Sequence, residues 1–345
     1  MDLYQILTQL CSLNGPSGFI GNIVDSAAKL LEPLVDEVSI DRMKSIIGIR
    51  RCGKPDAPKV LLDAHLDEIG FIVTGHEDGF LKFAAIGGID PRMLPGRELT
   101  ILGKKEGLGI IAVKPPHVLS AEERERSIPI KGLYIDVGLS QDEAQQRYPI
   151  GTPAVYRHEP VHLLGSRVSA KATDDRACFA VLLRTLDLIK GDNLDVDVYV
   201  LGSDAEEIGG TGAMTAAYRI NPDCAIAVDV TFGMQPDVDS KDAFALGTGP
   251  TIGVGPNMAR WMTKRMKSLA AKNKIPYSLE VLAGSSGTNG WEIQIAREGI
   301  ATQVISLPQR YMHTPIEVVD LEDMEYTASL IAAFVRSLNK EVLGC

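Results

Sequence analysis

Apolar residues recur at helical spacing over the first 36 residues, with one interruption. The interruption lies at residues 14–18, where the sequence NGPSG cannot continue a helix. One or two helices broken at this turn are therefore expected. Residues 38–51 then favour a β-hairpin, and residues 59–73 carry an apolar strand into a polar motif.

The pattern changes over residues 70–162. Short β-like runs alternate there with clusters of glycine and proline, and the one clear helical stretch is residues 139–147. This pattern predicts a small β-barrel or sandwich. After it, helical segments alternate with apolar strands. The helices are expected at 177–191, 211–220, 258–273 and 324–339, and the strands at 195–204, 224–232, 277–283 and 301–308.

Alternation of helices and strands is typical of an α/β sandwich around a mostly parallel sheet. We therefore predict an α/β fold: an α/β/α sandwich with a mixed, mostly parallel sheet, interrupted by an inserted, small β-barrel-like domain. Residues 1–69 and 163–345 are expected to form one discontinuous domain, and residues 70–162 the inserted β-rich domain.

Composition narrows the classes of partner. The chain has 345 residues, of which 45% are hydrophobic, so it can bury a sizeable core. Its formal net charge of -10 argues against nucleic acid or an anionic membrane as the main partner, because both attract basic surfaces. No apolar run approaches the roughly 20 residues that span a bilayer. The N-terminus also lacks the basic start of a signal peptide.

The cysteines are odd in number and show no CxxC spacing. They are Cys11, Cys52, Cys178, Cys224 and Cys345. Scattered cysteines of this kind are typical of a reducing compartment, so a cytoplasmic location is expected. Cys178 is expected to pack within a helix and not to act as a nucleophile.

The candidate chemistry lies in acidic and histidine residues at or just after the ends of apolar strands. They are His65 and Asp67 in AHLDEIG, Asp174 and Asp175 in KATDDRA, Glu206 and Glu207 in SDAEEIGG, Asp229 in AVDVT, and His313 in RYMHTP. Carboxylates and imidazoles are ligands that zinc and cobalt accept, and five of them can hold two ions. The set predicts a two-metal hydrolase.

Two cations held a few ångströms apart repel each other, so such a site needs several anionic ligands and usually one bridging carboxylate. Asp174 is our choice for the bridge. The set of metal ligands is then completed by His65, Glu207, Asp229 and His313.

Glu206 and Glu207 are adjacent, so their side chains cannot point the same way. One can bind metal while the other, Glu206, faces the activated water as the general base. Asp67 is expected to fix the orientation of His65 and not to bind metal itself.

Each motif has an ordinary explanation when it is taken alone. A Glu-Glu pair most often lies on a solvated surface, and an Asp-Asp pair such as 174–175 commonly caps a helix. His313 alone would more often be a surface residue. Asp229 is more informative, because its apolar strand offers no surface on which to solvate a carboxylate. The joint occurrence of all these residues at strand ends favours the metal site.

A glycine-rich run at 283–290 precedes a helical stretch at 291–299. No lysine follows in P-loop spacing and no GxGxxG unit follows a strand, so phosphate binding is weakly supported. A loop that lets a substrate approach the backbone closely is the better interpretation.

Taken in order, the motifs HLDE, DDRA, AEEIGGTGA, VDVT and RYMHTPIE closely resemble those of peptidase family M42. The family contains tetrahedral-assembly and glutamyl-type aminopeptidases, and some members carry the label endoglucanase or cellulase. The resemblance covers nearly the whole chain. It implies an aminopeptidase with two divalent ions per subunit, zinc or cobalt, acting on peptides with a free N-terminus. It also implies that the β-rich insertion is the dimerisation and assembly domain of a homo-oligomer, often a dodecamer.

Carried over residue by residue, the resemblance makes His65, Asp174 and Asp229 the ligands of one ion. Asp174, Glu207 and His313 would hold the other ion. These are the ligands that the residues themselves suggest.

The resemblance also gives Glu206 the role of acid and base, and Asp67 that of the supporting acid. In such relatives the peptide bond after the bridging aspartate is often cis. The bond between Asp174 and Asp175 is therefore a candidate for a cis bond that does not involve proline.

The long gap between His65 and Asp174 separates this chain from related carboxypeptidases, which carry their extra domain later. Some positions depart from the family pattern. Gly210 and Thr211 replace Leu and Arg, Cys178 replaces a common Gly, and Thr288-Asn289-Gly290 replaces a frequent TDA. None of these changes removes a ligand.

Two other functions are alternatives. A glycoside hydrolase needs two carboxylates and no metal, which would leave the histidines unexplained. A protein with the same fold but a degenerate site would serve assembly or binding alone. The sequence leaves open the preferred N-terminal residue, the metal and the number of subunits.

Overall fold

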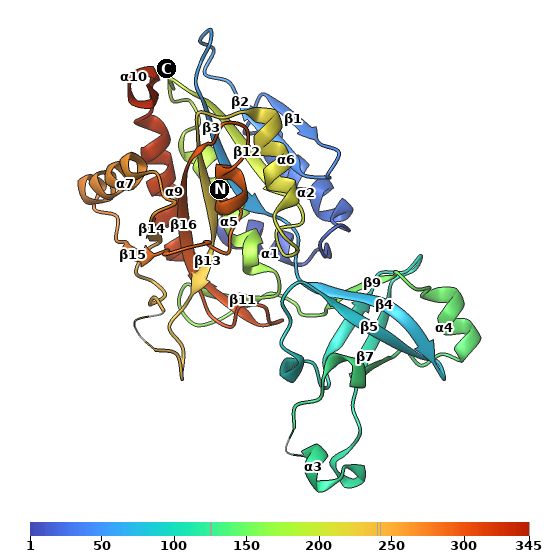
Figure 1. Cartoon of the computed structure of the whole chain (residues 1–345). Helices are drawn as coiled ribbons and strands as arrows, with labels where there is room; N and C mark the ends of the chain where they lie inside the picture. Colours follow the sequence, from blue (N-terminus) through green and yellow to red (C-terminus); the bar gives the residue numbers. More distant parts are fainter. Residues whose placement is uncertain (125, 240, 242, 345) are drawn as a thin grey trace.

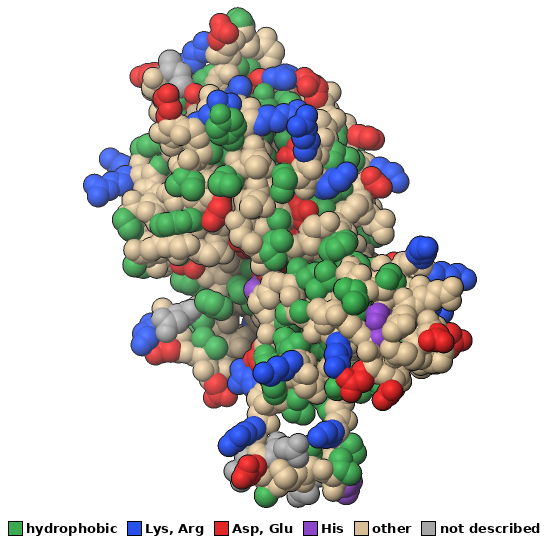
Figure 2. All heavy atoms as spheres, turned by 45° about the vertical axis from the view of Figure 1, so that its right-hand side comes forward, with side chains coloured by type: hydrophobic (Ala, Val, Ile, Leu, Met, Phe, Trp, Pro, Cys, Tyr) green, Lys and Arg blue, Asp and Glu red, His purple; other side chains and the backbone are tan. Residues whose placement is uncertain are grey.

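The computed structural model describes every residue except 125, 240, 242 and 345. A larger part built on a twisted sheet is joined to a smaller barrel, from which the segment around α3 (Ala121–Arg124) extends (Figure 1). In the space-filling view the barrel stands out from the larger part, and charged side chains are scattered over both (Figure 2). Within the described residues, no helix is long and apolar enough to cross a membrane.

Two helices begin the chain, as the sequence predicts. α1 spans Leu3–Cys11 and α2 spans Gly21–Leu31. The carboxylate of Asp2 caps α1 by accepting a hydrogen bond from the N–H of Gln5. The apolar faces of both helices are buried in the main hydrophobic core.

Eight strands form the central sheet. They are β1 (Glu37–Ile40), β2 (Ile46–Arg50), β3 (Lys59–His65), β12 (Asp197–Ser203), β13 (Cys224–Phe232), β14 (Thr251–Val254), β15 (Ser278–Val281) and β16 (Ala301–Gln309). Their order is β1-β2-β12-β3-β13-β16-β14-β15. Neighbouring strands are parallel along the stretch β12-β3-β13-β16, and β14 and β15 are also parallel. The remaining pairs, β1-β2, β2-β12 and β16-β14, are antiparallel. The sheet is thus mixed and mostly parallel, as predicted.

Helices cover both faces of this sheet. With α1 and α2, one face carries α5 (Thr173–Leu188), α7 (Arg260–Asn273) and α9 (Leu321–Arg336), and the other carries α6 (Thr211–Ile220) and α8 (Gly290–Gln294). A short α10 (Lys340–Leu343) follows α9. β13 shows why two layers form, because Ile226 and Val228 face one core while Ala225 and Ala227 face the other.

Six strands close into a barrel. They are β4 (Gly70–Glu77), β5 (Phe80–Ile86), β6 (Glu98–Ile101), β7 (Gly107–Ala112), β8 (Tyr134–Asp136) and β9 (Pro153–Tyr156), in the order β4-β5-β8-β7-β6-β9. The ring of Phe71 meets the rings of Phe83 and Tyr156 edge-on, at centroid distances of 5.4 and 5.2 Å. The predicted helix is α4 (Gln141–Arg147), and short 3-10 turns occur at Pro91–Met93, Pro116–Val118 and Ile130–Gly132.

A third sheet of three strands was not predicted. It consists of β10 (Val161–His162), β11 (Arg167–Ala170) and β17 (Glu317–Asp320). β11 pairs antiparallel with β17, with Ala170 opposite Glu317. This pairing places the start of α5 beside the loop that precedes β17, and both segments carry predicted site residues.

Candidate active site

Predicted site residues lie at the carboxyl ends of three neighbouring strands. His65 ends β3, Glu206 and Glu207 follow β12, and Asp229 lies near the end of β13. β3 pairs in parallel with both β12 and β13, so these ends meet at one edge of the sheet. The contact between β11 and β17 adds the residues from α5 and from the last loop.

Asp174 lies between two histidines. Its Oδ1 is 3.0 Å from Nε2 of His65, and its Oδ2 is 3.3 Å from Nε2 of His313. Burial raises the pKa of Asp174, but the hydrogen bonds with the two histidines outweigh burial and hold it below its usual range. The bond between Asp174 and Asp175 is cis, as the resemblance implies. Each carboxylate oxygen faces a different imidazole, as a bridging ligand requires.

His65 is 1% exposed and is oriented through its other ring nitrogen. Nδ1 lies 3.0 Å from the backbone carbonyl oxygen of Asp67 and 3.5 Å from its carboxylate. A hydrogen on Nδ1 directed at the carbonyl would leave Nε2 free to bind a cation. Burial lowers the pKa of His65, but the carboxylates of Asp174 and Asp67 raise it well above its usual value.

The carboxylate of Asp67 also holds the glutamate pair. It accepts hydrogen bonds from the backbone N–H of Glu206 at 3.2 Å and of Glu207 at 3.3 Å. The hydroxyl of Ser17, in the turn between α1 and α2, donates a hydrogen bond to the same carboxylate. Asp67 therefore fixes the backbone of both glutamates, while its carbonyl makes the shorter contact to the His65 ring.

His313 is tied to both parts of the molecule. Its Nε2 lies 3.3 Å from Oε2 of Glu207, and its Nδ1 lies 2.7 Å from the carbonyl oxygen of Gly88, just after β5. Burial lowers the pKa of His313, but Asp174 and Glu207 outweigh burial and raise it to about 10. The barrel hairpin thus supplies one of the contacts that orient this ring.

Two groups of potential metal ligands share His65. In one group the ligand atoms of His65, Asp174 and Glu207 lie within 4.8 Å of one another, and in the other those of His65, Asp175 and Asp229 do. Asp175 accepts a hydrogen bond from the backbone N–H of His65 at 3.2 Å through Oδ2. Its Oδ1 is buried and has no partner among the described residues. Asp175 therefore belongs to the site and is not a simple helix cap.

The cluster fits a metal centre. Burial raises the pKa of Glu206 to about 7, and raises the pKa of Glu207 and Asp229 well above the usual range. Carboxylates crowded in a buried place are stabilised by added positive charge. The unpartnered oxygen of Asp175 and the mixture of carboxylates with imidazoles also suit divalent ions.

A cavity of about 570 Å³ opens over the cluster. The end of β13 and the glycine-rich loop form its other walls. They contribute Val230, Thr231, Phe232, Ser285, Ser286, Gly287 and Thr288. A second cavity of about 560 Å³ adjoins the first at Gly88, Phe232, Met312 and His313. The site thus has room on both sides of His313.

Glu317 is a buried site residue that the sequence interpretation missed. Oε1 accepts the N–H of His313 at 3.1 Å, and Oε2 accepts the hydroxyl of Thr173 at 3.0 Å and the N–H of Asp174 at 3.2 Å. Burial raises its pKa to about 8. Its place four residues after His313, inside the same motif, was a usable signal. The sequence held no comparable signal for the carbonyl oxygen of Gly88, which contacts the ring of His313.

The fold and the site define an α/β protein with a buried cluster of carboxylates and imidazoles of the kind that hold divalent ions. Residues 45–330 match the family model described as M42 glutamyl aminopeptidase, and the chain belongs to this family. It is therefore an aminopeptidase.

Individual relatives cover nearly the whole chain. The lysyl aminopeptidase of Pyrococcus furiosus is 33% identical over 342 residues, which are 97% of each chain. The TET aminopeptidase of a marine-sediment Thaumarchaeota archaeon is 28% identical with a TM-score of 0.94, covering 99% of this chain and 98% of the other. The TET1 peptidase of Pyrococcus horikoshii, described as assembling into a tetrahedron or a large octahedral shell, is 28% identical with a TM-score of 0.85, covering 98% and 100%. Two similar structures carry the name endoglucanase.

Proposed function

We propose that the chain is a two-metal aminopeptidase that hydrolyses the first peptide bond of peptides with a free N-terminus. The observation that carries this proposal is the position of Asp174 between His65 and His313, with one carboxylate oxygen toward each ring. A carboxylate placed in this way can serve two cations at once. Membership of the M42 family supports the exopeptidase activity.

In this proposal His65, Asp174 and Asp229 hold one ion, and Asp174, Glu207 and His313 hold the other. The contacts of Asp174 with both histidines and of Glu207 with His313 support this division. The ligand atoms of His65 and Asp229 also lie within 4.8 Å of each other, as ligands of one ion must. Two imidazoles among the ligands favour zinc or cobalt over magnesium or calcium. When bound, such ions lower the pKa of a water molecule and polarise a peptide carbonyl.

Glu206 is the proposed general base. Its side chain is 16% exposed, and Oε2 lies 4.0 Å from Nε2 of His65. Burial raises its pKa to about 7, so near neutral pH it can accept a proton from the attacking water and pass it to the leaving amine. The hydrogen bond from its backbone to Asp67 holds it in place during this transfer.

We also propose that residues 70–162 form an assembly domain, separate from a catalytic domain of residues 1–69 and 163–345. The closed barrel with its own apolar core supports this division. Leu108 and Ile110, on the same side of β7, are each 46% exposed and could be covered by another subunit. The dodecamer and the shells described for similar TET1 peptidases support a homo-oligomer, which we propose is built from dimers and is a dodecamer.

A cytoplasmic location is part of the proposal. Cys11, Cys52 and Cys178 are free thiols, which suits a reducing compartment. Cys178 packs in the main core, and Cys345 lies outside the described residues.

The test uses the purified chain, stripped with a chelator and then reloaded with zinc or cobalt. We expect release of the N-terminal residue from a short peptide only after reloading, and none from the same peptide acetylated at its N-terminus. Equal activity in chelator, or internal cleavage of the acetylated peptide, would refute the proposal. A cellulose substrate in parallel tests the glycosidase alternative, which leaves both histidines of the cluster unexplained.

A further inference from the structure

The wall of the cavity beyond the metal-ligand cluster carries two further glutamates, Glu280 and Glu292. Glu280 lies on β15, the edge strand of the central sheet, and Glu292 lies in α8. Among the described residues that line this cavity there is neither a lysine nor an arginine. The part of the cavity outside the cluster is therefore acidic in its own right.

Two threonine hydroxyls fix the Glu280 carboxylate. Thr231 donates to Oε1 at 2.6 Å, and Thr251 donates to Oε2 at 2.7 Å. Neutral hydroxyl donors orient a carboxylate but leave its negative charge without a counter-charge. A carboxylate oriented in a cavity wall is suited to charge-assisted hydrogen bonds with a cationic group of a ligand.

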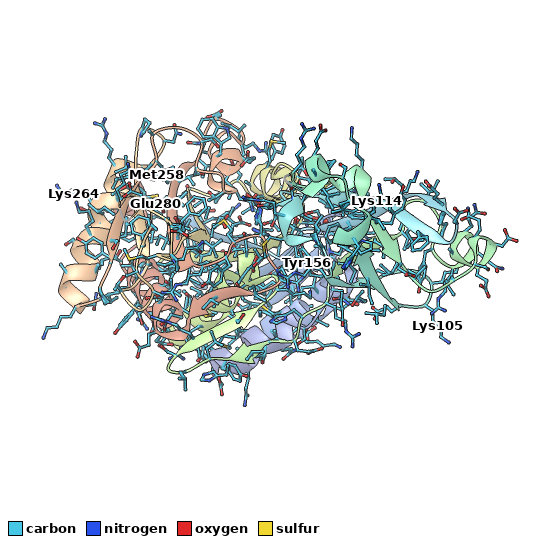
Figure 3. The ribbon with its side chains drawn as sticks, turned by 90° about the horizontal axis from the view of Figure 1, so that it is seen from below. Lys105, Lys114, Tyr156, Met258, Lys264 and Glu280 are labelled. Atoms are coloured by element: carbon cyan, nitrogen blue, oxygen red, sulfur yellow. The ribbon has the colours of Figure 1, made fainter. Side chains whose placement is uncertain are left out.

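The distance from the cluster to Glu280 matches a long side chain. Thr231 lies two residues after Asp229 on β13, so both side chains project from the same face. Two residues of an extended strand span roughly 6.6 Å, and Glu280 is one hydrogen bond further on. The four-carbon stem of lysine, or the longer side chain of arginine, covers a gap of this order. Figure 3 shows Glu280 in the larger part of the molecule, away from Tyr156 in the barrel.

We propose, on the basis of the aminopeptidase function proposed above, that Glu280 selects substrates whose N-terminal residue is lysine or arginine. The cationic tip donates to Glu280, while the glycine-rich loop lines the stem. An N-terminal glutamate would place a second carboxylate beside Glu280 and is disfavoured by repulsion. The family name refers to glutamyl substrates and one relative is named for lysyl substrates, so membership alone leaves the preference open.

The experiment compares kcat/KM of the metal-loaded protein for lysine, methionine and glutamate anilides. Methionine is unbranched like lysine but carries no charge. We expect the wild type to prefer lysine over methionine by about tenfold or more, the range of a hydrogen bond to a charged group. Glu280→Gln should lower the lysine-to-methionine ratio by about tenfold, and Glu280→Lys should favour the glutamate substrate.

Glu298→Gln is the matched control. It removes the same charge from an exposed position four residues after α8 and outside the cavity, so the wild-type ratio should persist. Hydrolysis of the methionine substrate by each variant reports an intact site.

A wild-type preference for methionine or glutamate over lysine would overturn the assignment of Glu280, and so would an unchanged ratio in Glu280→Gln. Either result requires that some anilide is cleaved. If the reloaded protein releases no residue from any substrate, the proposed aminopeptidase function itself fails, which separates the two proposals.

Discussion

The side-chain amide of Asn289 donates a hydrogen bond to the buried carboxylate of Asp63, with Nδ2 and Oδ2 2.8 Å apart. The same nitrogen donates to the hydroxyl of Ser203 at 2.9 Å. Asp63 lies two residues before His65 on β3, and Ser203 is the partner of His65 in the pairing of β3 with β12. The glycine-rich loop is therefore anchored to the strands that carry the cluster.

Asn289→Ala should weaken both folding and substrate binding. It leaves the buried Asp63 without this donor, and burial already raises the pKa of Asp63 to about 6. We expect the free energy of unfolding to fall by about 1–3 kcal/mol, and KM to rise because the loop lines the cavity. Denaturant unfolding of the metal-free protein and steady-state kinetics measure the two effects. Asn273→Ala, at an exposed asparagine that bonds to Leu269 of its own helix, is the control; equal effects in both variants would contradict the anchoring role.

The strand ends of the site could be predicted from sequence because each polar residue interrupts a long apolar run. His65 and Asp229 follow such runs in β3 and β13. The bond from Asn289 to Asp63 and the pairing of β11 with β17 join segments far apart in the chain, and neither leaves a local pattern. The pairing of β11 with β17 decides how Asp174 and His313 meet.

Short helices and strands account for other differences between the elements predicted from the sequence and those in the structure. The helix expected over 291–299 ends at Gln294. Arg297 then adopts a positive φ of 58°, and its guanidinium stacks on the ring of Tyr218 at 3.7 Å. β14 was missed because only four residues form it, between a Gly-Pro pair and a further glycine.

Glu68→Gln should be strongly destabilising. Glu68 is 3% exposed and accepts hydrogen bonds from Lys171 at 2.8 Å and Arg176 at 3.0 Å, which are themselves buried. Loss of the carboxylate leaves two buried cations without their partner, so we expect a loss of about 3–5 kcal/mol in unfolding free energy. Asp192→Asn, which breaks a half-exposed pair with Arg336, should cost less than about 1 kcal/mol. Similar losses for the two variants would argue against a stabilising role for the buried group of Glu68, Lys171 and Arg176.

Gly87→Ala tests the contact between barrel and cluster. Gly87 has a φ of +80°, and an added Cβ would lie 2.8 Å from Ile69 and 3.2 Å from Oε2 of Glu207. Displacement of Glu207 by this Cβ should weaken zinc binding. A ligand misplaced in this way can reduce kcat/KM by about tenfold to hundredfold. Gly138→Ala shares the positive φ, at +65°, but its Cβ would meet nothing within 4 Å. Zinc titration and kinetics should therefore separate the variants; identical values would show that the contact is unimportant.

Asp323 gives a pH dependence of stability remote from the cluster. It accepts hydrogen bonds from the N–H groups of Gly247 at 2.7 Å and Gly249 at 2.6 Å, and burial raises its pKa from 3.8 to about 6. The folded state thus binds a proton on Asp323 more tightly than the unfolded state does. Protonated Asp323 therefore stabilises the fold at low pH, and this contribution is lost as the pH rises from 3.8 to about 6. The unfolding free energy of the wild type minus that of Asp323→Asn should fall by roughly 3 kcal/mol. Urea unfolding of both metal-free proteins at several pH values in this range measures the difference in unfolding free energy. A difference that rises with pH would contradict the prediction.

The direct test of the proposed mechanism compares Glu206→Gln with Glu207→Gln, measuring metal content and kcat for the same anilide in each variant. Glu206→Gln should retain both ions while kcat falls by about 10²- to 10⁴-fold, because the proton acceptor is lost and the ligands remain. Glu207→Gln should instead lose bound metal. Full activity in Glu206→Gln with both ions in place would contradict the role of Glu206 and the mechanism built on it.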